Sequence, residues 1–426
     1  MFRKYILFLL FASAVATAQQ AASPSSSSVL TLEEVLSKVV ARNPALTAAQ
    51  HSIEAQQHRV PQAGALPDPN LSVSWMGSAV PFKTMAGDPS SYRGISAMQM
   101  LPLGGKLGLQ SKIARKDVTT AQDERVATER KLVADARAAY YDYYFYGKAL
   151  EITNRDKKRL EQLADISESR YRVGKAMQQD VLRAHVEVSM LLQRAVTFEQ
   201  QREIAAARLN TLMGAPPTAA LPPAAEVQES RLPELSLLAS MAEKSDPVLQ
   251  REQTQVEKNK LGIELARKQY IPDLSVGYMY QQRPAMPDMY GMQFTVNIPI
   301  FYKKKQREAI EQAKQEELAA KSNVDSRRLE IDYELKQMHA LAENSQKLLD
   351  LYKSAIIPQA ELALESSQSS YGVGNVDFLS VVTNFTTINS YEIDYYRQLA
   401  DYQTALARIE ALTGELNTAS EQEKNQ

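Results

Sequence analysis

The sequence contains no cysteine and very little histidine or tryptophan, with four and one of these residues in 426. The absence of cysteine excludes disulfides, thiolate metal sites, a cysteine nucleophile and a lipid attached to an amino-terminal cysteine. His51 and His58 lie about 10 Å apart along a predicted helix, too far to share one metal ion. We find no metal-ligand cluster, nucleophile motif or phosphate-binding loop, so the sequence predicts neither an enzyme nor a cofactor.

An excess of charge of either sign is also missing. Lysine and arginine number 49 against 50 aspartates and glutamates, so no surface for nucleic acid is predicted. No apolar run reaches the roughly 20 residues of a transmembrane helix. The apolar residues 6–15 follow two basic residues and precede a small-residue cleavage site. This pattern predicts a secretory signal peptide over residues 1–18 and a leader over residues 19–30, so membrane insertion would use strands.

The chain contains one structural unit twice. Corresponding motifs are separated by about 200 residues, and the small changes in spacing fall in predicted loops. We therefore predict repeats over residues 31–214 and 234–414, a linker over residues 215–233 and a disordered polar tail over residues 415–426. The recurring motifs are Asn43-Pro44-Ala45-Leu46 with Asp246-Pro247-Val248-Leu249, Asn70-Leu71-Ser72-Val73 with Asp273-Leu274-Ser275-Val276, and Tyr171-x-Val173-Gly174 with Tyr371-x-Val373-Gly374.

Two segments of each repeat alternate between apolar and polar residues, the pattern of a strand with one apolar face. Leu274, Val276 and Tyr278 share one such face. The predicted strands approach the length of a tilted transmembrane strand, about 9 to 11 residues. They cover approximately residues 70–77 and 92–101 in the first repeat, and 273–282 and 290–300 in the second.

Helices fill most of the remaining chain. Residues 31–61 predict a first helix with Thr31 as its N-cap and Glu34 as its capping-box partner. Two long rods of about 70 residues, roughly 105 Å each, carry apolar residues every 3.5 positions, which indicates coiled-coil packing. The second rod contains Pro358, where we expect a kink. The rods cover residues 102–173 and 301–371, and each returns as an antiparallel helix, over residues 178–212 and 376–412.

Four strands cannot close a barrel, and an open strand edge cannot face lipid because its backbone groups would stay unpaired. The protein must therefore oligomerise, so that several copies close one barrel and the hairpins close into a tube by the same symmetry. A barrel continuous with a long tube is a conduit. The predicted fold class is mostly α with a small β part.

The order and spacing of these motifs resemble the TolC-type outer-membrane efflux protein family, over nearly all of the mature chain. Leu66-Pro67-Asp68-Pro69 and a short second hairpin tip are similar to the heavy-metal branch of that family. The other motifs in the resemblance are the Asn-Pro and Asp-Pro helix starts, Leu101-Pro102-Leu103-Gly104-Gly105-Lys106, the two Tyr-x-Val-Gly tips, and the endings Leu212-Met213-Gly214 and Leu412-Thr413-Gly414.

The resemblance implies a homotrimer with a twelve-stranded barrel in the outer membrane and a helical tunnel through the periplasm. It also implies two partners, a periplasmic adaptor (membrane fusion protein) and an inner-membrane pump, besides outer-membrane lipid. The hairpin tips would form the periplasmic aperture and the docking surface for the adaptor. The implied tip and docking residues are Tyr171, Gly174, Asp180, Tyr371 and Gly374, and the implied aperture residues are Asp377, Phe378, Leu379 and Ser380.

Alternatives remain open for these residues. Asp377 is either a pore-lining carboxylate ring, which would favour cations, or an ordinary helix N-cap. Asp180 is predicted to be structural. The second tip counts three fewer residues between its glycine and its aspartate, and no arginine within residues 374–380 supplies a latch between helices. Apolar contact between Phe378 and Leu379 is therefore an alternative gate.

Two further groups of residues have a functional and a structural interpretation. Tyrosines and a phenylalanine crowd residues 140–146; we interpret them as packing between helices, with hydroxyls reaching water, rather than as an aromatic binding surface. Met286, Met289 and Met292 surround a predicted outer loop, and thioethers bind Cu(I) or Ag(I). An ordinary loop is the more economical interpretation of this methionine group.

The resulting functional hypothesis is a passive trimeric duct that exports metal ions or small toxic organic molecules. An outer-membrane duct for type I protein secretion is the first alternative. A periplasmic coiled-coil adaptor or structural protein is the second, although such a protein would not need paired apolar strands in both repeats. The sequence does not indicate which cargo is carried.

Overall fold

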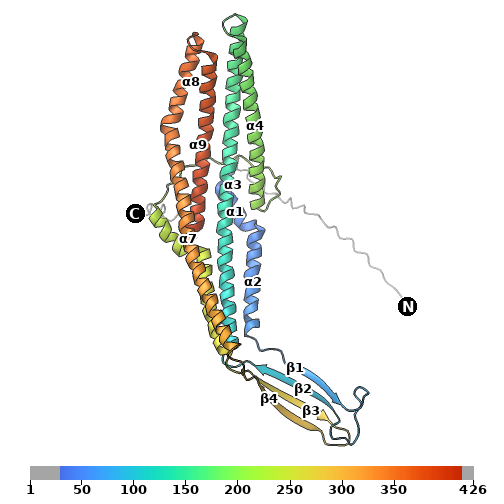
Figure 1. Ribbon diagram of the computed structural model, residues 1–426. Coiled ribbons are helices and arrows are strands. Elements are labelled where there is room, and N and C mark those ends of the chain that lie inside the picture. Colours follow the sequence, from blue (N-terminus) through green and yellow to red (C-terminus); the bar gives the residue numbers. More distant parts are fainter. Residues whose placement is uncertain (1–28, 415–426) are drawn as a thin grey trace, which may run out of the picture.

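The computed structural model describes residues 29–414, and the predicted signal peptide and polar tail lie outside the described residues. The protein is elongated, with a sheet at one end and two helical hairpins reaching to the other (Figure 1). Within residues 29–414, no helix is long and apolar enough to cross a membrane.

The first rod is a single helix of 67 residues, α3 (Lys106–Arg172), and its partner is α4 (Gln178–Leu212). The second rod is α7 (Gln306–Leu351), a π-helical turn η1 (Tyr352–Ile356) and α8 (Ile357–Gly372), and it returns as α9 (Phe378–Thr413). The π turn lies directly before Pro358, where a kink is predicted. Proline lacks the N–H for the helical bond and its ring crowds the preceding turn, so the backbone widens there.

The first predicted helix is in fact two helices, α1 (Leu32–Arg42) and α2 (Pro44–Gly64). A proline disfavours helical geometry in the residue before it, and Asn43 adopts φ −70° and ψ 123°. Its side chain accepts a hydrogen bond from Ala45 N at 2.9 Å and so caps α2. Thr31 caps α1 by accepting from Glu34 N, but the Glu34 carboxylate pairs with Lys38 instead of completing a capping box.

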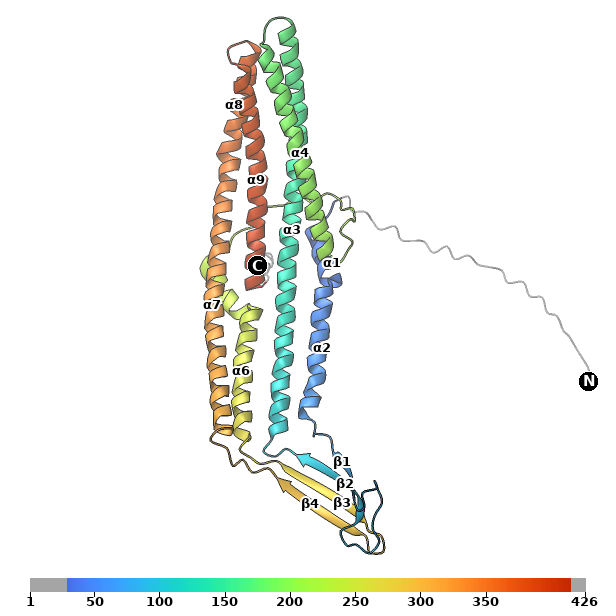
Figure 2. The ribbon, with the colours of Figure 1, turned by 45° about the vertical axis from the view of Figure 1, so that its right-hand side comes forward.

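The second repeat has the same arrangement in α5 (Leu235–Ser245) and α6 (Pro247–Lys268), with Asp246 as the cap between them. Each returning hairpin helix ends against such a junction. Asn43 Nδ2 donates to the Leu212 carbonyl at 2.8 Å, and Ser245 Oγ donates to the Thr413 carbonyl at 2.7 Å. Thus α4 and α2, like α9 and α6, form two nearly continuous columns (Figure 2).

Helix α3 is the centre of the helical layer. It contacts α4 and α9 in the hairpin half, and α2 and α6 in the half nearer the sheet. Helix α7 contacts α6 and α9, and α8 contacts α9. The layer is therefore four helices wide, with α2 and α4 at one edge and α7 and α8 at the other.

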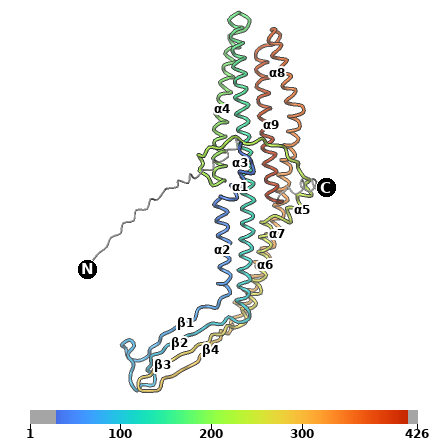
Figure 3. The backbone as a smooth tube through the Cα atoms, turned by 180° about the vertical axis from the view of Figure 1, so that it is seen from behind, coloured from blue at the N-terminus to red at the C-terminus, as the bar shows by residue number. Residues whose placement is uncertain are grey.

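The tyrosine-rich stretch of α3 anchors the linker between the repeats, which crosses the helices at mid-height (Figure 3). Tyr140 donates to the Leu30 carbonyl at 3.0 Å, Tyr143 to the Leu221 carbonyl at 3.1 Å and Tyr144 to a Glu226 carboxylate oxygen at 2.7 Å. The predicted packing role is therefore correct, and these hydroxyls, expected to reach water, donate to groups of the chain itself. Burial raises the pKa of Tyr140 to about 12.

One antiparallel sheet contains β1 (Asn70–Met76), β2 (Tyr92–Leu101), β3 (Leu274–Gln282) and β4 (Met289–Val296), in that order. Strands β2 and β3 pair, so the sheet joins the two repeats. The prediction for β4 ran to residue 300, but the strand ends at Val296, before Pro299, which has no N–H for the ladder.

The register places every leucine, isoleucine, valine, phenylalanine and tryptophan of the four strands on one face, whereas five of the six methionines lie on the other. Val73 pairs with Ile95, Ile95 pairs with Tyr280, and Tyr280 pairs with Tyr290. Phe294, two pairs further along the same face, has 64% of its surface exposed. Serine, glycine, threonine and glutamine occupy most of the opposite face. The sheet thus has one apolar and one mainly polar face.

Candidate functional site at the hairpin tips

The two hairpin tips have the same backbone structure. Gly174 and Gly374 adopt left-handed φ values of 73° and 85°, which side chains oppose. Gly174 N donates to the Tyr171 carbonyl at 2.9 Å, and Gly374 N donates to the Tyr371 carbonyl at 3.1 Å. In both loops the next residue donates to the carbonyl five positions earlier. Each long helix therefore ends in a Schellman turn.

The two tip loops are also equal in length, so the prediction of a shorter second tip is wrong. Helices α4 and α9 each begin at the fourth residue after the glycine. The prediction matched Asp180 with Asp377 because both are acidic, but Asp377 corresponds to Met177, and Asp180 corresponds to Ser380. The supposed short tip consequently no longer supports a relationship to the heavy-metal branch.

Both aspartates cap helices. Asp377 is the N-cap of α9 and accepts hydrogen bonds from Ser380 N, at 3.1 Å, and from Ser380 Oγ. These bonds lower the pKa of the exposed Asp377 carboxyl, with the Ser380 side chain as the largest cause. Asp180 lies one turn into α4 and accepts from Met177 N at 3.3 Å. Asp377 is thus an anionic cap on an exposed turn.

The predicted aperture residues differ in exposure. Phe378 is only 2% exposed and packs against Tyr371, with ring centroids 5.5 Å apart. Its burial inside the tip contradicts the proposal that Phe378 itself closes the aperture by apolar contact. Leu379 and Ser380 are exposed, and so is Tyr171, although its counterpart Tyr371 is buried.

An arginine that the sequence analysis missed connects the tips. Arg170, at the end of α3, donates to the carbonyls of Tyr371 at 2.6 Å and Gly372 at 3.2 Å. Its guanidinium lies 4.6 Å from the centre of the Tyr371 ring. The sequence search looked for a latch in the second tip only. The sequence did contain a signal for this contact. The first repeat has an arginine at position 170, whereas the second repeat has Ser370 at the matching position.

A buried polar network joins the hairpins further down. Asp156 on α3 accepts from Asn389 Nδ2 on α9 at 2.8 Å, and it pairs with Arg155 at 2.9 Å. Arg155 also pairs with Glu392, and burial raises the pKa of the Glu392 carboxyl. Arg194 on α4 lies 3.5 Å from Asn389 Oδ1. These contacts fix α9 against α3 and α4 with hydrogen bonds that apolar packing alone would not specify.

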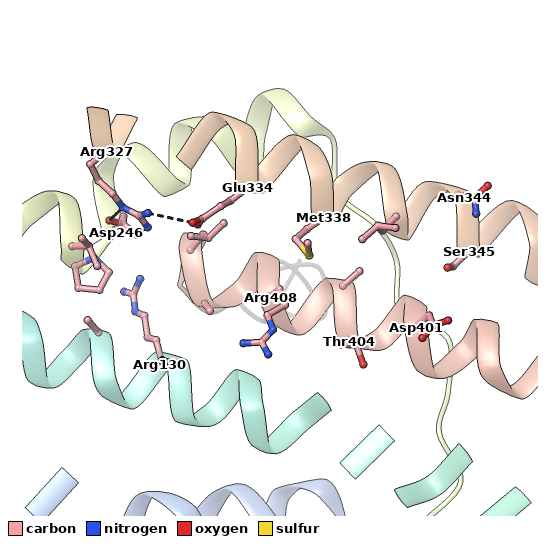
Figure 4. Close-up of a pocket in the computed structure, with 18 of the residues that line it drawn as sticks. Arg130, Asp246, Arg327, Glu334, Met338, Asn344, Ser345, Asp401, Thr404 and Arg408 are labelled. Carbon is pink, nitrogen blue, oxygen red and sulfur yellow. Dashed lines mark hydrogen bonds and ion pairs between the residues drawn. The ribbon is translucent and has the colours of Figure 1, made fainter. Parts of the chain in front are cut away.

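A cavity of about 840 Å³ lies where α9 ends and α6 begins, beside α3 and α7 (Figure 4). At its wall Arg327 on α7 pairs with Asp246 at 3.0 Å and, along its own helix, with Glu334 at 3.4 Å. Arg130 donates to the Ser245 carbonyl at 2.9 Å. Since these charged groups bind each other or the helix ends, we assign the cavity a structural role at the helix junction.

In the described part of the chain, the geometry gives no candidate metal centre. Among residues 29–414, no group of three or more histidine, aspartate or glutamate residues is placed to hold a metal ion. Met289 pairs with Gln281 and Met292 with Tyr278, so the two methionines lie on opposite faces of β4. They cannot converge on one ion from the same strand, which excludes the three-methionine site considered above.

The chain is thus a four-stranded sheet continuous with two long helical hairpins. The sequence matches the outer membrane efflux protein family over residues 35–215 and 238–415, so the chain belongs to that family. It is a TolC-type outer-membrane efflux channel, and the family consists of transport ducts. The two matched segments coincide closely with the two repeats.

Solved structures share the fold at low sequence identity. The chain is similar to CusC, at 16% identity, covering 90% of this chain and 92% of that one with a TM-score of 0.77. It is similar to VceC of Vibrio cholerae, at 16% identity, 91% and 97% coverage and a TM-score of 0.75. It is also similar to the open state of MtrE of Neisseria gonorrhoeae, at 18% identity, 90% and 89% coverage and a TM-score of 0.73. No curated protein matches the sequence.

Proposed function

We propose that the chain forms a homotrimer whose sheets close a twelve-stranded barrel in the outer membrane and whose hairpins form a tunnel across the periplasm. The trimer would be a passive duct, receiving cargo from a periplasmic adaptor and an inner-membrane pump. A secretory signal peptide over residues 1–18 would direct export. The cargo class we propose is metal ions or small toxic organic molecules.

The observation that supports this proposal is that the sheet and the helical layer each have two edges without a neighbouring element. Among the described residues, strands β1 and β4 each have one neighbour in the sheet, and α2/α4 and α7/α8 form the corresponding edges of the helical layer. The open strand edges flank an exposed apolar face, and lipid cannot satisfy their backbone groups. Head-to-tail association of identical copies would pair β4 with the next β1 and close both layers into rings.

The tips are then proposed as the periplasmic end of the duct. Asp377, Leu379 and Ser380 would line the aperture, with Phe378 supporting that turn from within. Tyr171, Gly174, Asp180, Tyr371 and Gly374 would shape the surface on which the adaptor docks. The equal turns of the two repeats support this part of the proposal, because they give an adaptor similar binding sites at alternating positions around the ring.

The assembly is tested by isolating the full-length protein from the outer-membrane fraction. We expect trimers that survive mild detergent and separate into monomers on heating, and discrete conductance steps in planar bilayers. A soluble periplasmic monomer would overturn the proposal and favour the adaptor-like alternative. That alternative leaves the apolar sheet face without a role.

The cargo is tested by growth of a strain that lacks the gene on graded metal salts and on unrelated toxic organic compounds. Selective sensitivity that the intact gene reverses would assign the duct to a pump for that class. If growth is normal but a secreted protein accumulates inside the cells, the cargo proposal fails and type I secretion replaces it.

A further inference from the structure

The connection between β4 and α7, residues 297–305, has an unusual composition, and we call it the basic joint. Ile300 and Phe301 have 76% and 79% of their surfaces exposed. Lys303, Lys304 and Lys305 follow them and are also exposed. Exposed apolar side chains therefore lie directly beside positively charged ones, so the joint has an amphipathic surface.

The apolar part of the joint begins just beyond the apolar face of β4, which ends at Val296. Ile298 and Ile300 follow Phe294 and Val296 at every second position, and all four side chains are at least half exposed. The ring of Tyr302 lies 6.2 Å from that of Tyr270, at the end of α6. The joint therefore sits where the sheet meets the helices, at the bottom of the helical layer (Figure 1).

Within residues 29–414 the lysines of the joint have no carboxylate partner. Among the described residues no ion pair involves Lys303, Lys304 or Lys305, whereas Arg307 pairs with Glu308 at 3.4 Å. The last turn of α6 adds Arg267 and Lys268 nearby. A group of cations without internal neutralisation favours an anionic partner, and the attraction weakens as salt screens it.

In the first repeat, the matching connection between β2 and α3 leads to a lysine with a structural role. Lys106 is 5% exposed and donates to Asp273 Oδ1 and to the Ile271 carbonyl, both at 2.7 Å. It fastens α3 to the start of β3. Because Lys106 already performs this role, the three exposed lysines of the second connection are not needed to hold helix and sheet together.

We propose that the basic joint binds the phosphate headgroups of anionic phospholipids at the periplasmic surface of the outer membrane. Ile298, Ile300 and Phe301 would enter the acyl boundary, and the lysines would extend to the headgroups. Clusters of basic residues beside a membrane-embedded segment attract anionic lipid in this way. The inference rests on the proposed insertion of the sheet, which gives the joint its position at the interface.

The test uses full-length protein carrying Trp75→Phe and Phe301→Trp, which leaves one tryptophan, at the joint. The trimer is reconstituted in phosphatidylethanolamine vesicles containing about 20 mol% phosphatidylglycerol, with bromine on the acyl chains of one lipid or the other. Quenching of tryptophan fluorescence measures which lipid surrounds the joint. We expect roughly twofold enrichment of phosphatidylglycerol over its bulk share, which falls when the salt is raised to about 0.5 M.

The decisive variant is Lys303→Gln/Lys304→Gln/Lys305→Gln, which should abolish the enrichment. The control Lys158→Gln/Lys244→Gln/Lys336→Gln removes the same charge from three exposed lysines that have no ion pair among the described residues and lie away from the joint, and it should keep the enrichment. Quenching by each lipid in proportion to its bulk share in the parent protein would overturn this inference and leave the channel proposal intact. No quenching by either lipid would overturn both, because the sheet would not be in the bilayer.

Discussion

At the scale of single residues, Asp377 combines a structural and a functional role. Its carboxylate caps α9 while the side chain remains exposed on the tip turn. Asparagine is also a good N-cap, so Asp377→Asn removes the charge and keeps the hydrogen bond. We expect this variant to assemble normally and to lower the cation selectivity of the reconstituted pore, measured from reversal potentials. Asp180→Asn serves as the control, and unchanged selectivity of Asp377→Asn would remove Asp377 from the aperture.

Asp377 also determines how the cation selectivity should depend on pH. Because the folded-state pKa of Asp377 is lowered, the charged carboxylate persists below the ordinary aspartate range, about pH 4. The cap therefore stabilises the turn at pH values above the pKa that Asp377 has in the unfolded chain. This contribution is lost as the pH falls through the lowered pKa of the folded state. We expect cation selectivity to be constant from neutral pH down to about 5 and to decline only below about 4. A decline that begins near pH 6 would contradict this assignment.

Arg170 is the residue whose removal should loosen the tips. It joins two hairpins through backbone carbonyls and the Tyr371 ring, and alanine would remove all three contacts. We expect Arg170→Ala to raise the single-channel conductance and to accelerate amide exchange at the second tip turn. Arg170→Lys should be intermediate, because a lysine keeps the charge but loses the planar fork.

Arg172→Ala is a suitable control for that change. Arg172 is exposed on the same helix end and pairs with Glu168 on its own helix, so its loss should leave the tips unchanged. If both alanine variants raise conductance equally, Arg170 has no special role in holding the hairpins together.

At the scale of secondary-structure elements, a buried lysine connects α3 to the start of β3. Lys106→Met removes a buried charge and leaves Asp273 with one partner fewer. We expect the assembled protein to lose about 1–3 kcal/mol of stability. A lower temperature for heat dissociation of the trimer would measure this loss. Lys112→Met, the same change at an exposed position of α3, should have little effect. Equal shifts in both variants would show that the Lys106–Asp273 pair contributes nothing specific.

Local signals in the sequence predicted most elements, and the errors also have local causes. Strand alternation located β2 and β3, and the glycine turns located the tips. The break at Asn43 was visible in the proline that follows it, but the first helix was predicted as continuous. The tip lengths were compared through two acidic residues rather than through the helix starts. The Arg170 contacts join residues 201 and 202 positions apart, which no local pattern indicates.

At the scale of the whole molecule, the two faces of the sheet allow the proposed membrane insertion to be tested with an expected free-energy cost. Phe294→Lys places a charge on the apolar face, where burial in lipid costs about 2–4 kcal/mol near the midplane. Gln293→Lys introduces the same residue on the polar face of the same strand. We expect Phe294→Lys to reduce the trimer recovered from the outer membrane and Gln293→Lys to leave it unchanged. The reverse order would mean that the lumen and the lipid have been assigned to the wrong faces.

The pairing of β2 with β3 also has a consequence for the history of each molecule after export. Strand β2 ends at Leu101 and its partner begins at Leu274, so the emerging chain presents an apolar strand with an open edge until the first strand of the second repeat has been translocated. Such long-range pairing is slow and leaves intermediates prone to aggregation. We expect the first repeat to depend on periplasmic chaperones throughout this interval, which cross-linking of nascent chains from the β2 edge would detect. A chain stalled before β3 should then remain bound to a chaperone, whereas a chain extended through β3 should be released.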